Sequence, residues 1–206
     1  MPPLPPEAWL RGPVPAIPDL LQPVAHSLIQ ADEEIGRITE DIDVESLWVR
    51  PGGAAAIGFH LAHLTGALDR LFRYARGDEL DTAQREWMAA ERKMHEDRPP
   101  LSDLLTEWEL VKQRALAQLA ATDPAQLATP RFVGRARLPS TVLGLLFHAA
   151  EHTTRHVGQM VTTHKVVTGP GLSDLIDMKR KASRPLDLID LAALEARRDD
   201  ENPDDA

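Results

Sequence analysis

Apolar and small residues recur along residues 24–42 with the spacing of an amphipathic helix. The intervals alternate between four and three positions, which places these side chains on one helical face. Pro23 suits the first helical position, because its missing N–H would have no partner there. The stripe comprises Val24, Leu28, Ala31, Ile35, Ile38 and Ile42. The pattern predicts a helix that packs this face against a core.

Three further segments show the same helical period. A second helix should follow Pro51 and end at Gly77, a residue type typical of helix C-termini. Its stripe is Ile57, Leu61, Leu64, Leu68 and Leu71. A third helix should begin at about Ser102 as the N-cap and end before Asp123 and Pro124, and a fourth should run from Ser140 and Thr141 to the residue before Gly169. Four helices of this length predict an all-α fold, a four-helix bundle.

Two of the connections between these helices are longer than the short loops of a simple bundle. Residues 78–100 should be partly helical around residues 84–94, and residues 123–139 could be briefly extended at residues 132–133 and 135–138. Connections of this length predict at least one long crossover.

The ends of the chain differ in composition from its centre. Residues 1–18 contain seven prolines and predict an extended, Pro-rich N-terminal arm, which Trp9 and Leu10 could dock on the core. Residues 195–206 contain six acidic side chains and predict a disordered acidic tail. The bundle domain is therefore expected at residues 19–194, with a short extra helix within residues 172–194.

Composition narrows the classes of function. A formal net charge of -9 disfavours nucleic acid as a partner. No apolar run approaches a membrane span, and no apolar signal core follows the first residues, so we expect no membrane partner and a cytoplasmic location. The chain contains no Cys, so a transition metal would need His, Asp or Glu ligands. Long apolar stripes also predict a homodimer formed through helix pairing.

The expected buried stripe of the fourth helix becomes polar at its middle. It reads Val142, Leu145, Ala149, His152, His156, Gln159 or Met160, and Thr163. Burying two imidazoles is costly unless each is hydrogen-bonded or metal-bound. Residues four apart lie close together on one helical face, so His152 and His156 have the spacing of a two-point metal chelate. His148 extends the row by one turn.

A third ligand could come from the second helix, which carries His60 and His63. At about 100° per residue, His60 lies closer to the centre of the apolar stripe, and periodicity alone favours it as the ligand. His26, His95 and His164 have no clustered partner in the sequence and are expected at the surface or at helix ends.

Two segments carry a resemblance to a known family. The stretches AIGFHLAHLTGALD (56–69) and HAAEHTTRHVGQM (148–160) resemble the hallmark segments of the DinB-like superfamily, which includes bacillithiol transferases and mycothiol-dependent maleylpyruvate isomerases. Matched residue by residue, the resemblance implies metal ligands at His63, His152 and His156. It also implies a four-helix bundle with a long crossover. It conflicts with periodicity on one point, because it selects His63 in place of His60.

A three-histidine site would leave a divalent ion, Zn²⁺ or Ni²⁺, with an open coordination position. Such an ion can lower the pKa of a bound water to about 7, or ionise a coordinated thiol. The resemblance implies a thiol S-transferase or a hydrolase for a small electrophilic substrate, with a low-molecular-weight thiol as a cosubstrate in the first case. A non-catalytic metal- or ligand-binding bundle is the alternative.

Three residues beside the predicted ligands could assist such a site. His148 could lie at its rim, and Gln159 could orient a ligand or a bound water. Glu151 completes the sequence H-x-x-E-H with His148 and His152, the inverted zinc-protease motif in which Glu acts as the base. That reading is disfavoured, because the sequence offers no second domain to form a substrate cleft.

Overall fold

The computed structural model describes residues 5–169. The extra helix predicted within residues 172–194 and the acidic tail predicted at residues 195–206 lie outside the described residues. The division of the chain into arm, bundle domain and tail therefore stays a prediction.

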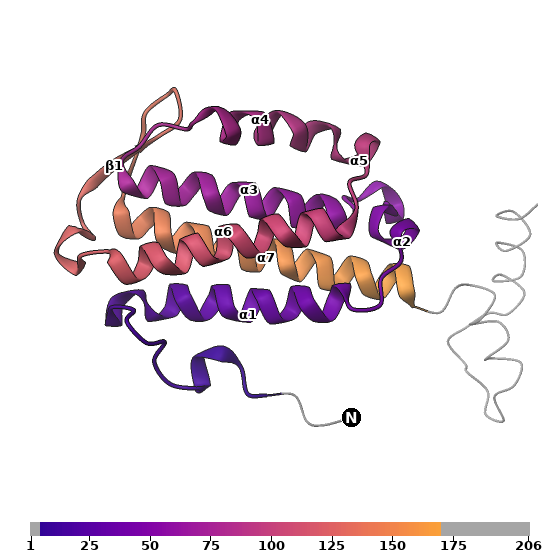
Figure 1. The fold of residues 1–206 in the computed structure, drawn as a ribbon, viewed down its shortest axis with the longest axis horizontal. Helices are drawn as coiled ribbons and strands as arrows, with labels where there is room; N and C mark the ends of the chain where they lie inside the picture. Colours follow the sequence, from indigo (N-terminus) through magenta and orange to yellow (C-terminus); the bar gives the residue numbers. More distant parts are fainter. Residues whose placement is uncertain (1–4, 170–206) are drawn as a thin grey trace, which may run out of the picture. The chain divides into compact units, whose positions relative to one another are not determined.

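Four long helices lie alongside one another and form the bundle (Figure 1). They are α1 (Gln22–Thr39), α3 (Ile57–Arg76), α6 (Leu101–Ala121) and α7 (Val142–Thr168). The shorter helices are α2 (Val44–Trp48), α4 (Thr82–Ala90) and α5 (Met94–Asp97), with 3-10 turns η1 (Ala8–Leu10), η2 (Asp19–Leu21), η3 (Pro51–Gly53), η4 (Glu91–Lys93) and η5 (Pro124–Gln126). The predicted all-α four-helix bundle is confirmed, and none of the helices within residues 5–169 is long and apolar enough to span a bilayer.

Local chemistry explains where the long helices begin and end. Gly77 ends α3 with φ +91°, a left-handed conformation that favours glycine. Thr141 starts α7, where its Oγ1 accepts a hydrogen bond from the Gly144 N–H at 3.0 Å. The prediction of Ser102 as the N-cap of α6 was wrong. Pro100 occupies that position, because its carbonyl already accepts hydrogen bonds from the N–H groups of residues 103 and 104.

Both long connections contain secondary structure. The crossover at residues 78–100 carries α4, η4 and α5, which confirms the predicted helical content, and α4 lies against α3 (Figure 1). The second connection forms an antiparallel hairpin of β1 (Pro130–Val133) and β2 (Leu138–Thr141). Extended structure at residues 132–133 is confirmed. Residues 134–137 form the turn instead of a strand, with positive φ at Gly134 and Arg137.

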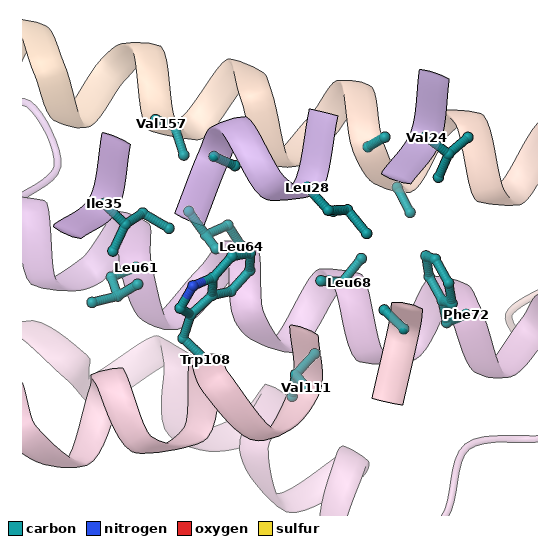
Figure 2. Packing of buried hydrophobic residues seen from close by; sticks show 14 of the residues in the cluster. Val24, Leu28, Ile35, Leu61, Leu64, Leu68, Phe72, Trp108, Val111 and Val157 are labelled. Atoms are coloured by element: carbon teal, nitrogen blue, oxygen red, sulfur yellow. The ribbon is translucent and has the colours of Figure 1, made fainter. Parts of the chain in front are cut away.

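The apolar stripes predicted on the helices meet in one core (Figure 2). Large aliphatic side chains from α1 and α3 face each other, and Trp108 of α6 packs between them. The labelled core residues are Val24, Leu28 and Ile35 of α1, Leu61, Leu64, Leu68 and Phe72 of α3, Trp108 and Val111 of α6, and Val157 of α7. This core holds α3 and α7, which carry the candidate site, in fixed positions.

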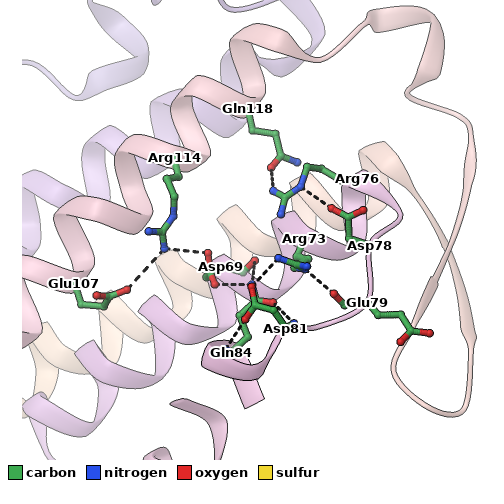
Figure 3. A network of polar contacts seen from close by, with 10 residues as sticks. All are labelled: Asp69, Arg73, Arg76, Asp78, Glu79, Asp81, Gln84, Glu107, Arg114 and Gln118. Carbon is green, nitrogen blue, oxygen red and sulfur yellow. Dashed lines mark hydrogen bonds and ion pairs between the residues drawn. The ribbon is translucent and has the colours of Figure 1, made fainter. Parts of the chain in front are cut away.

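A polar network ties the start of the crossover to α3 and α6 (Figure 3). The Asp81 side chain caps α4 by accepting a hydrogen bond from the Gln84 N–H. The side-chain oxygen of Gln84 accepts one from the Asp81 N–H. The Gln84 side chain also donates a hydrogen bond to the Asp69 carboxylate at 2.6 Å. The same carboxylate accepts a hydrogen bond from Arg114 of α6 at 3.2 Å. Arg73 of α3 binds the Asp81 carboxylate. A cavity of about 500 Å³ lies beside this network, and Asp69, Arg73 and Arg114 are among its lining residues.

The N-terminal arm packs along α1 by other residues than predicted. Trp9 and Leu10 are 61% and 58% exposed, so their predicted docking was wrong. The turn η1 directs Ala8 toward the bundle instead, and its N–H donates to Gln30 of α1 at 3.0 Å. Ile17 supplies a second buried contact.

Candidate metal centre

The histidines of α7 flank its buried face. The buried row follows residues 149, 153, 157 and 160, and His152 and His156 are half-buried at its edge. The prediction that these two histidines belong to the buried stripe was therefore wrong by about one residue of rotation. The edge position lowers the free-energy cost of burying a polar ring.

Three imidazoles from two helices converge beside this seam. One ring nitrogen from each of His63, His152 and His156 lies within 4.8 Å of the others, a spacing that could hold a metal ion. The ring centroids are 5.2 Å apart for His63 and His152, 4.7 Å for His63 and His156, and 4.5 Å for His152 and His156. The structure thus brings together the three residues that the resemblance selected.

His60 lies beside this group and is not a member of it. Its side chain is buried, with 6% exposure, as the helical period predicted. Its Nδ1 lies 3.0 Å from Nδ1 of His156, close enough for a hydrogen bond between the rings. Periodicity therefore ranked the burial of His60 and His63 correctly, but the ring that joins the converging group is the less buried His63.

Glu91 is a site residue that the sequence did not reveal. It lies on η4 in the crossover, and its Oε2 is 2.9 Å from Nδ1 of His63. Its Oε1 accepts a hydrogen bond from Arg70 of α3. Glu91 is 28 residues from His63 along the chain, and nothing in its local sequence separates it from the other acidic residues of the crossover.

Burial keeps the rings of His60, His152 and His156 neutral. Desolvation, and then repulsion by neighbouring imidazole charges, lowers the pKa values of His60, His152 and His156 from 6.5 to about 4. At neutral pH each of these rings is uncharged and has one nitrogen with a lone pair, the form in which histidine binds a metal.

An aromatic wall borders the group on α3. The ring of Phe59 is nearly parallel to His63, with centroids 5.8 Å apart, and to His95 at 5.0 Å. His95 also meets Trp48 edge-on at 6.1 Å. The expectation that His95 has no clustered partner was therefore wrong, because the crossover brings it to α3.

The assisting residues predicted on α7 lie at the rim. His148 is half-exposed, and its Nδ1 lies 3.4 Å from a Glu151 carboxylate oxygen. Glu151 also pairs with Arg155, and Gln159 is exposed to solvent. The inverted protease motif requires His148 and His152 as the converging pair, but the converging pair on this helix is His152 and His156. The geometry therefore disfavours that motif.

The family model of the DinB superfamily matches residues 3–160, a range that includes all three converging histidines. The chain belongs to the DinB superfamily. This superfamily includes metal-dependent enzymes, and the three-histidine group agrees with that membership. A search of curated proteins finds no match.

The donor set of this DinB-superfamily chain fits a divalent transition metal. Nδ1 of His152 is buried and has no hydrogen-bond partner among the described residues, an arrangement that costs free energy in a metal-free site. Nδ1 of His63 faces the Glu91 carboxylate, so the lone pair of this neutral ring lies on Nε2. Nδ1 of His156 lies 3.0 Å from Nδ1 of His60, and Nε2 of His156 is available to a metal when its Nδ1 is the donor in this pair. Neutral imidazoles are ligands that Zn²⁺ and Ni²⁺ accept.

Proposed function

We propose that the protein is a metal-dependent enzyme in which His63, His152 and His156 hold Zn²⁺ or Ni²⁺. The observation that carries this proposal is the convergence of three imidazole nitrogens within 4.8 Å from two helices. The low pKa of two of these rings supports it, because they need not lose a proton to bind a metal at neutral pH.

The proposed reaction is thiol S-transfer to, or hydrolysis of, a small electrophilic substrate. A divalent ion in this position would supply Lewis acidity, which activates a thiol or a water as a nucleophile. In S-transfer the thiol sulfur forms a bond to a substrate carbon, the leaving group departs with its electron pair, and the thiol proton passes to solvent or a base. The chain has no Cys, so the sulfur must arrive with a low-molecular-weight cosubstrate.

The residues around the proposed ligands have separate tasks in this scheme. His60 engages Nδ1 of His156 and so restrains that ring. Phe59 stacks near His63 and limits access of water from that side. His148, Glu151 and Arg155 lie at the exposed rim, where a small polar substrate would first meet the protein.

Metal analysis of untagged protein tests the ligand set. We expect about one equivalent of a transition metal in the wild type and a large loss in the His152→Ala, His156→Ala double variant. His148→Ala is the matched control, since this residue lies one turn away on the same helix but outside the converging group. The proposal would be contradicted if the wild type bound no metal after incubation with Zn²⁺ or Ni²⁺. Unchanged metal content in the double variant would contradict it as well.

An activity screen then separates an enzyme from a metal-binding bundle. The metal-loaded protein is incubated with bacillithiol, mycothiol or glutathione and a chlorinated or epoxide electrophile, and hydrolysis is followed without thiol. Turnover that a chelator abolishes supports the enzyme. Metal binding without turnover supports the non-catalytic alternative. The cytoplasmic location and the homodimer stay predictions.

A further inference from the structure

The crossover approaches α3 most closely at Gly66. A Cβ atom placed on Gly66 would lie 2.5 Å from Oε1 of Glu91 and closer still to the ring of Trp87. Real Cβ atoms do not approach other heavy atoms at such distances, so a larger residue would displace this part of the crossover. Gly66 therefore provides a notch in α3 into which the crossover fits.

Two residues of the crossover occupy this notch with matching spacing. Trp87 and Glu91 are four residues apart, as are Ala62, Gly66 and Arg70 on α3. The Trp87 Nε1–H donates to the carbonyl oxygen of Ala62 at 3.1 Å, one turn before the notch. Glu91 binds Arg70, one turn after it. The crossover is thus held on both sides of Gly66.

This arrangement delivers a buried carboxylate to His63. Glu91 is 8% exposed, and each of its two oxygens has a partner, Arg70 on one and His63 on the other. A carboxylate paired with an arginine can only accept a hydrogen bond, so Nδ1 of His63 must carry the proton. The lone pair of the neutral ring then lies on Nε2.

We propose that Glu91 is a positioning residue that fixes the tautomer and orientation of His63, and that Trp87 and the Gly66 notch hold Glu91 in place. Carboxylates that bind the outer nitrogen of a metal-ligating histidine fix its ring and raise its basicity. This inference rests on the proposed function for its effect on metal affinity. Its effect on the tautomer is a property of the metal-free protein.

The substitution Glu91→Gln tests the proposal with little change in shape. The single amide oxygen would serve Arg70, which can only donate, and the amide NH₂ would then face Nδ1 of His63. We expect the proton of His63 to move from Nδ1 to Nε2, which blocks the nitrogen that the proposed site uses. Long-range ¹H–¹⁵N spectra of the metal-free protein at pH 8 report this change directly.

Metal affinity provides a second readout. We expect a 10–100-fold weaker Zn²⁺ affinity in Glu91→Gln, measured by competition with a chelating dye. Glu86→Gln is the matched control, because Glu86 is exposed on α4 and should leave both the tautomer and the affinity unchanged. Trp87→Phe keeps an aromatic side chain but loses the indole N–H that binds Ala62, and should weaken affinity less than Glu91→Gln does.

The outcomes distinguish this inference from the proposed function. A wild-type His63 that is protonated mainly on Nε2 in the metal-free protein would overturn the positioning role of Glu91, whatever the metal content. An unchanged tautomer and a Zn²⁺ affinity within twofold in Glu91→Gln would overturn it as well. Failure of the wild type to bind any metal, with the Nδ1 proton in place, would overturn the proposed function and leave the tautomer control by Glu91 standing.

Discussion

The absence of a Cβ atom at Gly58 allows the Trp48 ring to pack against α3, close to His95 and Phe59. A Cβ atom at Gly58 would lie 2.8 Å from both Cζ2 and Cη2 of Trp48. Trp48 is buried and belongs to the main core, so its ring has little freedom to move. We expect Gly58→Ala to lower the free energy of unfolding by about 1–3 kcal/mol through overpacking, measured by urea denaturation of the metal-free protein.

Gly36→Ala is the matched control for this prediction. Gly36 also lies within a long helix, but a Cβ atom there would meet nothing within 4 Å. Alanine is the better helix former, so this change should stabilise the protein by about 0.5–1 kcal/mol. Equal effects of the two substitutions would show that contact with Trp48 does not decide the outcome at Gly58.

Individual site residues could be predicted from the sequence only in part. The spacing of His152 and His156 predicted that they share one helical face, because the helical period fixes their separation. The third member came from the resemblance, since periodicity reports burial and not the direction in which a ring reaches. Glu91 could not be predicted, because the docking of the crossover at Gly66 depends on tertiary packing.

At the scale of elements, a partly buried polar link connects α1 with α6. Asp32 of α1 accepts a hydrogen bond from Nε1 of Trp108 at 2.8 Å, and its other oxygen lies 2.8 Å from Nζ of Lys112. We expect Asp32→Ala to cost about 2 kcal/mol of unfolding free energy, because it leaves a buried N–H and a largely buried ammonium without this partner. Asp32→Asn, which keeps an acceptor for Trp108, should cost about half as much.

Glu109 provides the control for the link between α1 and α6. It also binds Lys112, but its side chain is 47% exposed and lies on α6 itself. We expect Glu109→Ala to cost about 0.5 kcal/mol at most, as is usual for exposed ion pairs. Chemical denaturation of the four proteins under identical conditions checks the order, and a cost for Glu109→Ala as large as that for Asp32→Ala would contradict it.

The elements with a sustained helical period were predictable, and so was helical content in the crossover, whereas the short helix α2 was not. The four long helices each offer at least five periodic positions, which is enough to identify them. The helix α2 spans five residues, too few to show a period, although Asp43 caps it by accepting from the Ser46 N–H at 2.7 Å. The rotation of α7 about its axis was also not predicted. Ala150 and Thr153 are small enough to lie on the buried face, and the sequence pattern did not show that they, and not His152, occupy it.

At the scale of the whole molecule, the three-histidine group exists only when the bundle is folded. His63 comes from α3, His152 and His156 come from α7, and Glu91 comes from the crossover between α3 and α6. An unfolded chain does not bring these segments together. Metal binding should therefore be linked to folding, and so should the protonation of the same imidazoles.

The low pKa values predict that metal-free protein loses stability in mild acid. Between pH 6.5 and about 4, the histidines of the unfolded chain bind protons while His60, His152 and His156 in the folded state stay neutral. Protons therefore favour unfolding, and the free energy of unfolding should fall as the pH decreases through this window. His95, whose pKa is also lowered by burial, contributes in the same direction.

Urea denaturation at intervals from pH 7.5 to 5, with a chelator present, measures this dependence. The partly exposed carboxyls of Glu33 and Glu109, whose pKa values lie below 4.5 because of hydrogen bonds to Arg11 and Lys112, titrate below this range. The His152→Ala, His156→Ala double variant should show a shallower slope. A wild-type slope no steeper than that of the double variant would contradict the assignment to these two rings.

Added metal should make the pH dependence steeper. Free Zn²⁺ at about 100 times its Kd should raise the free energy of unfolding at pH 7.5 by about 2.7 kcal/mol if it binds the folded state alone. Since protons compete for the same nitrogens, this increment should shrink as the pH falls toward the pKa of about 4 of His152 and His156. His148→Ala should retain the increment and the double variant should lose it. An increment that persists unchanged at pH 4, or in the double variant, would contradict metal binding by His152 and His156.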